Sequence, residues 1–369
     1  IQKTPDSYFG QCYEFSISKP LYELTEQFPN IDSTVNRIKE IKDGVKTHAT
    51  PYDNQNPNEL EDRVRQLSAG SRAISAPLVN FEGQNSSDNS GSLDPTGAAG
   101  PNHYVQAINS KYRVYSKTGN PLMSSLNLKS LWSEASDDIC DPIVLYDKFA
   151  DRWFIQIMDG VTNKILIAVS TSPDPTGTFY KYTFIPNASD FPDYPKFSIW
   201  SDGYYMTAYF LNTNSGKYSP RVVIFDREKM LAGDSKSGMI VAPFNPSASA
   251  PISGEKLFSA LTLDADGQLP PYGTPNYLIY YLDNNQQSGV TDAIAMYKIT
   301  TNWGSKTAEV VFDNLLPVQS FNSYFTGNAS EDISQPGTTE KLQALDGFFS
   351  YRAPYRVWTG YNSFVVCNA

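Results

Sequence analysis

Four short runs between residues 141 and 184 decide the fold: DPIVLYD (141–147), RWFIQIM (152–158), KILIAVS (164–170) and FYKYTF (179–184). Each run is rich in β-branched and aromatic residues, and turn-forming residues such as Asp, Gly, Asn and Pro separate it from the next. This pattern is typical of strands joined by short connections. Four such strands make one antiparallel sheet, which is the size of a β-propeller blade.

The same grouping repeats along the chain. Further groups begin at YPKFSIW (194–200), KLFSALTLD (256–264) and KLQALDG (341–347), and two more runs, HYVQAIN (103–109) and KYRVYSK (111–117), precede the first group. Short connections within groups and longer ones between them favour up-and-down blades over a Greek-key sandwich, the alternative fold. We therefore predict an all-β fold, a β-propeller of four-stranded blades, with about five blades in this chain and the last one incomplete.

The first part of the chain has a different texture. Apolar residues recur at helical spacing in 38–45 and again in 60–67, and the stretch between them is rich in Pro and Asn. These patterns predict two short helices in an irregular segment. We divide the chain into an N-terminal lead-in, residues 1–85, and a propeller, residues 86–369.

Composition restricts the partners. The chain has 29 Lys and Arg against 39 Asp and Glu, which gives a formal net charge of -10 and disfavours nucleic acid and anionic membrane surfaces. No apolar stretch approaches the roughly 20 residues of a transmembrane helix. We expect no transmembrane segment and no nucleic-acid partner.

The three cysteines carry little information. Cys12, Cys140 and Cys367 are far apart and form no CxxC pair, and the chain has only two His, so a zinc site lacks ligands. Cys140 and Cys367 fall in or beside apolar strand-like runs, so we expect buried, inert thiols there, and the count leaves one disulfide open.

Several segments carry a family resemblance: 92–122, 141–154, 191–210, 269–284 and 335–356. With these motifs the chain resembles, from about residue 14 to residue 369, a family of large secreted or surface bacterial β-propeller proteins. Many of its members are cargo of the type IX secretion route of Bacteroidota. The resemblance implies an exported or cell-surface protein, associated with the outer membrane, and it supplies no established activity or catalytic residues.

The family pattern also bears on the last blade. Members usually continue beyond the position of FVVCNA (364–369) with further strands. The resemblance therefore implies a longer natural chain, with seven or more blades in all. The alternatives are that the lead-in closes the last blade or that another chain docks at its open edge.

Carboxylates are the candidate catalytic groups. Asp141, Asp147 and Asp193 stand at the ends of predicted strands, where propeller residues face the rim or the central channel. A pair of carboxylates can supply the acid and the base or nucleophile of a glycoside hydrolase. The alternative is that these Asp residues accept backbone N–H bonds in turns.

The tetrapeptide DPTG occurs at 94–97 and again at 174–177. Because Pro fixes φ and Gly accepts positive φ, each copy predicts a tight turn. The alternative is that Asp94 binds calcium together with nearby carbonyl groups, since this cation prefers oxygen ligands. Calcium is the one cofactor that we consider.

Aromatic and cationic side chains are the candidate ligand-binding groups: Trp200, Tyr204, Tyr205, Arg152, Lys196 and His103. Because side chains alternate along a strand, one of the two tyrosines is expected to face outward and contact a ligand. Arg152 and Lys196 could hold a carboxylate of the protein or of an acidic sugar. A structural role in the core or in loops is the alternative for all six.

These observations support two functional hypotheses. The first is a secreted or cell-surface propeller that acts as a non-enzymatic binding, adhesion or scaffold module for a glycan or an extracellular protein. The second is a carbohydrate-active enzyme, a glycoside hydrolase, that uses carboxylates at the central channel. The sequence has no GxSxG nucleophile turn, so it does not predict a serine hydrolase.

Overall fold

The computed structural model describes residues 6–24, 77–85, 94–215, 218–243, 260–284, 290–321, 333–334, 337–339, 341–342, 352–358 and 361–364. Nearly all regular structure in these ranges is β-strand, and the one α-helix there is α1 (Arg227–Ala232). The predicted all-β class is confirmed. The helices predicted in 38–45 and 60–67 lie outside the described residues.

Four antiparallel sheets follow one another along the chain, and each contains four consecutive strands. Blade 1 is β3 (Thr96–Ala99), β4 (His103–Ile108), β5 (Lys111–Ser116) and β6 (Leu126–Asn127); blade 2 is β7 (Ile139–Asp147), β8 (Arg152–Asp159), β9 (Lys164–Ser170) and β10 (Phe179–Phe184). Blade 3 is β11 (Asp190–Ile199), β12 (Tyr204–Asn212), β13 (Tyr218–Phe225) and β14 (Gly238–Pro243); blade 4 is β15 (Leu261–Ala265), β16 (Asn276–Leu282), β17 (Ala293–Asn302) and β18 (Thr307–Pro317).

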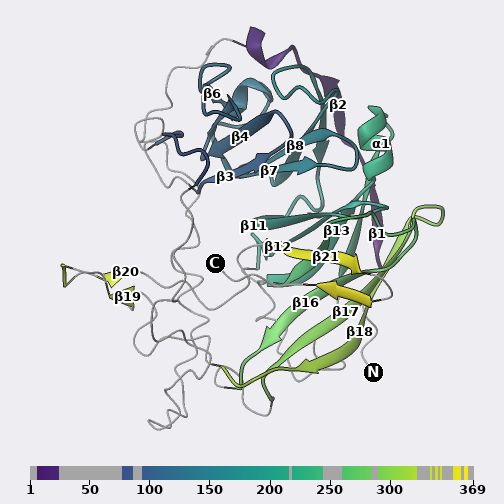
Figure 1. The fold of residues 1–369 in the computed structure, drawn as a ribbon. Helices are drawn as coiled ribbons and strands as arrows, with labels where there is room; N and C mark the ends of the chain where they lie inside the picture. The colour runs from purple at the N-terminus through teal and green to yellow at the C-terminus, as the bar shows by residue number, and fades with distance from the viewer. Residues whose placement is uncertain are drawn as a thin grey trace.

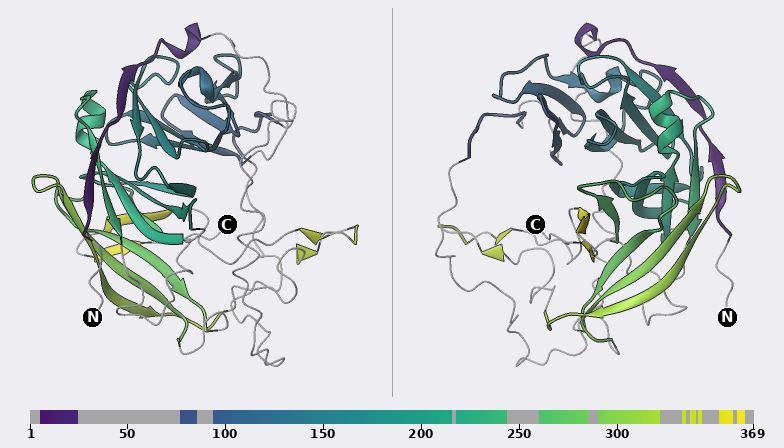
Figure 2. Two further views of the ribbon diagram at one scale, coloured as in Figure 1. Left: turned by 180° about the vertical axis from the view of Figure 1, so that it is seen from behind. Right: turned by 45° about the vertical axis from the view of Figure 1, so that its right-hand side comes forward.

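The first strand of each blade is the inner strand. Strand β7 contacts both β3 and β11, and β11 contacts β15, so the inner strands of successive blades are neighbours. Figures 1 and 2 show the blades following one another along an arc. This order of four-stranded, up-and-down sheets confirms the predicted β-propeller.

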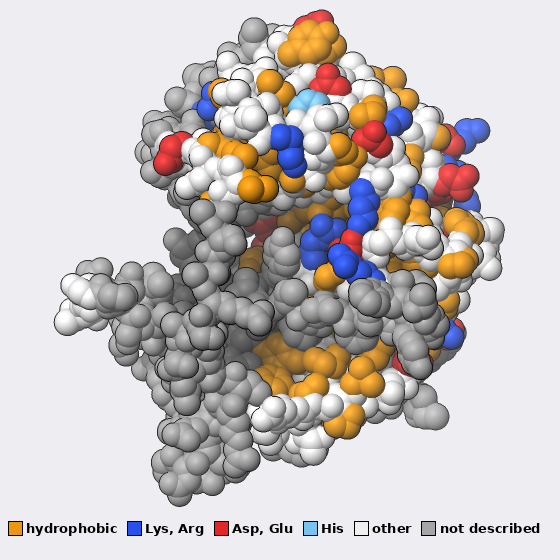
Figure 3. All heavy atoms as spheres, in the orientation of Figure 1, with side chains coloured by type: hydrophobic (Ala, Val, Ile, Leu, Met, Phe, Trp, Pro, Cys, Tyr) orange, Lys and Arg blue, Asp and Glu red, His pale blue; other side chains and the backbone are white. Residues whose placement is uncertain are grey.

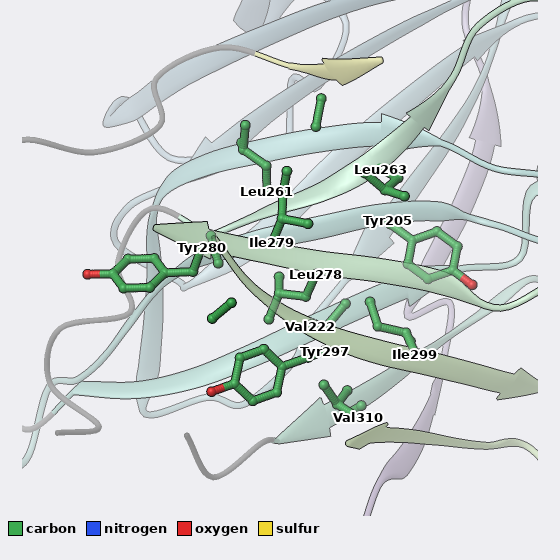
Figure 4. Packing of buried hydrophobic residues seen from close by; sticks show 14 of the residues in the cluster. Tyr205, Val222, Leu261, Leu263, Leu278, Ile279, Tyr280, Tyr297, Ile299 and Val310 are labelled. Carbon is green, nitrogen blue, oxygen red and sulfur yellow. The ribbon is translucent and has the colours of Figure 1, made fainter. Parts of the chain in front are cut away.

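Apolar clusters fill the space between blades. One cluster joins blades 1 and 2, a second joins blades 2 and 3, and a third joins blades 3 and 4. In the third, Tyr205 and Val222 of blade 3 pack against Leu278 and Ile299 of blade 4 (Figure 4). Because side chains alternate along each strand, a middle blade buries apolar residues on both of its faces.

A strap from the N-terminal segment runs along the outside of two blades. Its strand β1 (Tyr8–Gln11) pairs with β14, and its strand β2 (Glu14–Ile17) pairs with β10. Figure 2 shows this purple segment following the outer edge of the molecule. The strap, residues 8–17, adds a fifth strand to blades 3 and 2 and covers edges that would otherwise expose backbone groups. The 3₁₀ turn Leu21–Glu23 follows it.

The C-terminal segment adds a hairpin on the inner side of blade 4. Strand β21 (Ala353–Trp358) pairs in parallel with β15 and in antiparallel with β22 (Tyr361–Phe364). A separate short pair is formed by β19 (Ile333–Ser334) and β20 (Lys341–Leu342). The described part of the last group is therefore a hairpin on β15, and whether a further blade is completed stays a prediction.

Within blades 1 to 4, three strands are absent from the sequence prediction: β3, β6 and β14; the short strands β1, β2 and β19 outside these blades were not predicted either. Strand β3 begins within the DPTG stretch that we interpreted as a turn, and β6 has only two residues. Strand β14 follows the short helix α1, which ends at Gly233 with φ 70. Within the described part, no helix has the length and apolar character to cross a membrane.

Candidate functional site

Three aspartates lie where the inner strands of three successive blades begin. Asp94 leads into β3, Asp141 is the third residue of β7, and Asp193 lies in β11. The pairing register of β7 shifts next to Asp141, and that of β11 shifts next to Asp193. These bulges turn side chains away from the regular alternation of the strand.

Several residues at these strand entries have a strained backbone conformation. Of the six described non-glycine residues with positive φ, three belong here: Asp94 (φ 37), Asp141 (φ 53) and Tyr194 (φ 54). This conformation is unfavourable for residues with a Cβ atom and is retained where the surroundings impose it. Such strain is common at functional sites, because it places side chains where regular strands would not.

Hydrogen bonds connect the three strand entries. The Asn109 side chain accepts from the backbone N–H of Asp141 at 3.0 Å and donates to Asp94 Oδ2 at 2.5 Å. Asp141 Oδ2 accepts from the backbone N–H of Tyr194 at 3.1 Å. The Asp193 side chain lies close enough to Asp141 to act on the ionisation of its carboxyl group. Together these residues form the acidic site, in which Asp94 is exposed and Asp141 and Asp193 are half-buried.

The electrostatics of the acidic site favour a retained proton. Burial raises the pKa of Asp141, and the negative charge of Asp94 raises it further. Two neighbouring carboxylates do not both ionise readily, so we expect the Asp141–Asp193 pair to hold one proton. Burial also raises the pKa of Tyr194, and the charges of all three aspartates add to this effect, as expected where they converge.

Lys196 supplies the cation of the acidic site. Its Nζ lies 3.6 Å from the centre of the Tyr194 ring, a cation–π contact. Removal from water lowers its pKa to about 8, although Asp141 and Asp193 favour the charged form. Lys196 is one of the two cations predicted to hold a carboxylate of the protein or of an acidic sugar, and the charges of Asp141 and Asp193 act on it.

Asp147 lies at the opposite end of β7, away from the acidic site. Its fully buried carboxylate accepts hydrogen bonds from Arg227 Nε at 2.7 Å, Arg227 Nη2 at 3.0 Å and Tyr204 OH at 2.9 Å. It also accepts from the backbone N–H of Phe149 at 3.2 Å. These contacts join the inner strand of blade 2 to blade 3, so the structure gives Asp147 a structural position and does not bring it to Asp141 and Asp193.

The expectation that an aromatic side chain of β12 faces a ligand is corrected. Trp200, Tyr204 and Tyr205 are all at most 1% exposed. Tyr204 packs in the cluster toward blade 2, whereas Trp200 and Tyr205 pack in the cluster toward blade 4. Alternation along the strand does point the two tyrosines to opposite faces, but a neighbouring blade covers each face.

The remaining candidates are dispersed. Arg152 donates from Nη1 to the carbonyl oxygens of Ala150 and Asp151, at 3.2 and 2.9 Å, and so fixes a turn. His103 is half-buried at the start of β4.

Among the residues that the structure describes, no three His, Cys, Asp or Glu side chains are grouped to hold a metal ion. Cys12 and Cys140 are thiols, and Cys367 lies outside the described ranges.

A simple sequence signal marks the acidic site. Asp94 and Asp141 are each followed directly by Pro, and Asp193 is followed by Tyr and then Pro. Each of these Asp residues stands at the entry to the first strand of a blade. The prediction for Asp94 was a turn or a calcium ligand, because the strand after it was not predicted to belong to a blade.

Comparisons with known proteins find no matching family model and no matching curated protein. Among solved structures, the chain is similar to the catalytic domain of a GH62 α-L-arabinofuranosidase from Coprinopsis cinerea, with TM-score 0.34, 14% identity, and 73% of this chain and 84% of that chain covered. It is also similar to a GH62 hydrolase in complex with xylotriose, with TM-score 0.32, 13% identity, and 65% and 73% covered. A thermostable family-43 glycoside hydrolase has TM-score 0.22, 13% identity, and 63% and 97% covered. The scores are low, and the fold assignment rests on the strand order.

Proposed function

We propose that the protein is a carbohydrate-active enzyme, a glycoside hydrolase, whose catalytic groups are Asp94, Asp141 and Asp193. One observation carries the proposal: Asn109 links Asp94 to the backbone of Asp141, and Asp193 acts on the ionisation of Asp141, so the entries of three successive blades each bring one aspartate to the same place. Cleavage of an acetal needs a proton donor and a second carboxylate, and this cluster offers both. Asp94 is exposed, so the acidic site is accessible from solvent.

The roles follow from the surroundings of each group. The proton held by the Asp141–Asp193 pair passes to the leaving oxygen as the glycosidic C–O bond breaks. Asp94 accepts a proton from a water molecule whose oxygen bonds to the anomeric carbon. Lys196 stabilises the negative charge that the pair acquires when its proton leaves. Exchange with solvent then returns the proton to the pair and removes it from Asp94.

The rival function is a non-enzymatic binding module. Its support in the sequence is the family resemblance, the surplus of aromatic residues and the lack of a strong catalytic motif. Of the aromatic candidates, Trp200, Tyr204 and Tyr205 are buried between blades. The extracellular or cell-surface setting, outer-membrane association and the family resemblance stay predictions. An exported hydrolase would meet polymeric glycans in that setting.

The test is product release from a panel of plant, algal and host polysaccharides, with reducing ends as the readout. Asp141→Asn and Asp94→Asn are expected to lower turnover by about 100-fold or more, because each removes a proton-transfer group. Thermal unfolding should shift little, because Asn has the shape of Asp. Asp174→Asn is the matched control: it alters the second DPTG copy, whose exposed Asp174 Oδ1 accepts from the Thr176 backbone N–H at 2.8 Å.

Three results would decide the matter. Loss of turnover in both site variants, with wild-type turnover in Asp174→Asn, supports the hydrolase. Full turnover in Asp141→Asn and Asp94→Asn would refute the assigned roles. Saturable glycan binding by the wild-type protein without product would favour the binding module instead.

A further inference from the structure

A second cluster of charges lies where the inner strands end, opposite the acidic site. Lys148 directly follows β7, and Asp264 and Asp266 lie at the end of β15. Arg352 directly precedes β21, and Arg356 lies in β21. We call these five residues the basic cluster. Figure 3 shows Lys and Arg side chains gathered beside a hollow in the middle of this face, close to the position of β21 in Figure 1.

Two cations of the basic cluster share one carboxylate. Asp266 forms ion pairs with Lys148 through Oδ1 and with Arg356 Nε through Oδ2, the latter at 2.6 Å. The hydrogen bond from Lys148 lowers the pKa of Asp266, and the bond from Arg356 adds to this effect. Asp266 therefore stays ionised, yet one negative charge faces two positive charges.

The other carboxylate of the basic cluster, Asp264, does not balance this excess of positive charge. Asp264 is buried, pairs with Arg352 Nη2 and accepts from the Ile199 backbone N–H at 2.9 Å. Burial raises the pKa of Asp264, opposed by Arg352. Among the described residues, Arg352 Nε is a buried donor without a hydrogen-bond partner. Buried polar groups of this kind usually mark a missing partner, such as a ligand or water.

The cations are accessible. The side chains of Lys148, Arg352 and Arg356 are 42%, 37% and 58% exposed, respectively. Lys148 comes directly after β7 and the two arginines come from β21 and the residue before it, whereas their carboxylate partners come from the end of β15. A guanidinium group matches the two oxygens of a carboxylate or a sulfate ester in geometry as well as in charge.

We infer that the basic cluster is a subsite for an anionic substituent on the glycan, a carboxylate or sulfate ester carried by a sugar. The inference rests on the proposed function, because it names the substrate class of that enzyme: an acidic polysaccharide. The basic cluster and the acidic site lie at opposite ends of β7, so the anionic substituent belongs to a sugar several residues along the polysaccharide from the bond that is cleaved. An anion would neutralise the excess positive charge. It would also accept hydrogen bonds from those N–H groups of the three cations that are not bonded to Asp264 or Asp266.

The experiment is calorimetric titration of the full chain with three probes: an oligogalacturonate, a sulfated galactan oligosaccharide and a neutral xylo-oligosaccharide. Arg356→Gln and Lys148→Gln each remove one positive charge from the basic cluster. Lys236→Gln is the matched control, because Lys236 is exposed after α1, and the variant changes the net charge equally. Thermal unfolding of every variant separates loss of binding from loss of folding.

Binding of one anionic probe by the wild type, with the neutral probe bound at least about tenfold more weakly, is the expected result. Each site variant should weaken that binding about tenfold, the value of one charge-assisted hydrogen bond, while Lys236→Gln should not. The preferred probe tells carboxylate from sulfate. Equal binding of all probes, or folded site variants with wild-type affinity, would overturn the inference.

Failure of this inference and failure of the proposed function have different signatures. Carried out in Asp141→Asn, which is expected not to turn the probes over, the titration measures binding alone and is independent of catalysis at the acidic site. Anion binding that persists in Asp141→Asn, together with an absence of product in the wild type, would retain the subsite and reject the hydrolase. Turnover of neutral glycans only would retain the hydrolase and reject the subsite.

Discussion

Asp202 is a buried carboxylic acid between blades 3 and 4. It is 5% exposed, accepts from Tyr205 OH at 2.9 Å, and its carbonyl oxygen accepts from Trp303 Nε1 at 2.7 Å. Burial raises the pKa of Asp202 to about 6, although the hydrogen bond from Tyr205 favours the charged form. The charged form is therefore less stable in the folded protein than in the unfolded chain.

This placement predicts a pH-dependent effect of Asp202→Asn. Because the folded pKa is raised, the contribution of Asp202 to stability is fully present below about pH 4 and is lost as pH rises toward about 6. Asn keeps an acceptor for Tyr205 without the charge. We expect the variant to be more stable than the wild type at pH 8, by up to about 3 kcal/mol, and nearly equal at pH 4.

Urea denaturation at the two pH values measures this difference. Val161→Ala, which alters an exposed apolar side chain and no titratable group, should differ from wild type equally at both pH values. A constant difference between Asp202→Asn and wild type at both values would contradict the assignment.

At the scale of elements, the strap depends on one apolar contact in β2. Phe15 is half-buried and lies 5.1 Å from Tyr182 between ring centroids, against the cluster that joins blades 2 and 3. Ile17, two residues on, is 57% exposed. The backbone ladder to β10 is available to any sequence, so the Phe15 contact selects this register.

Phe15→Ala should therefore loosen the strap without unfolding the blades. Removal of the ring leaves β2 held mainly by its ladder, and local opening becomes easier than global unfolding. Hydrogen exchange at residues 14–17 should become at least about tenfold faster, equivalent to about 1.4 kcal/mol. Ile17→Ala, which removes an exposed apolar side chain, should leave exchange unchanged. Equal acceleration in both variants would show that strand propensity, and not packing, holds the strap.

At the scale of the whole molecule, local patterns in the sequence predict the blades but not their edges. The runs around Trp153 and Ile279 are long enough to identify, since both faces of these strands are buried and apolar residues continue without interruption. The short β3 and β6 have no such run. The pairing of β2 with β10 joins Tyr180 to Ile17, a contact far apart in sequence that no local signal specifies.

Local sequence patterns also predicted only part of the acidic site. Strand ends suggested Asp141 and Asp193, because first strands of successive blades are neighbours. They suggested Asp147 equally, because the sequence does not show that Arg227 reaches its carboxylate. Likewise, nothing local to Tyr204 and Tyr205 indicates that blades cover both faces of β12. Tertiary packing decides these cases.

The shared clusters predict that the blades unfold together. Phe154 in β8 is fully buried, and its ring centroid lies 5.2 Å from that of Phe197 and 4.9 Å from that of Tyr204, both in blade 3. Phe154→Ala removes a contact that belongs to two blades at once. We expect it to lower the free energy of unfolding by about 3 to 5 kcal/mol, as for other buried aromatic residues.

The loss should appear in both blades. Hydrogen exchange in β9 and in β13 should accelerate by similar factors, and far-ultraviolet and near-ultraviolet circular dichroism should report one shifted transition. Val161→Ala, at a side chain 65% exposed, serves as the control and should leave both strands unchanged. Acceleration confined to β9 would mean that blades 2 and 3 are separate cooperative units. In that case the carboxylates of the acidic site, which come from blades 1, 2 and 3, would be held together by their own hydrogen bonds and not by the core.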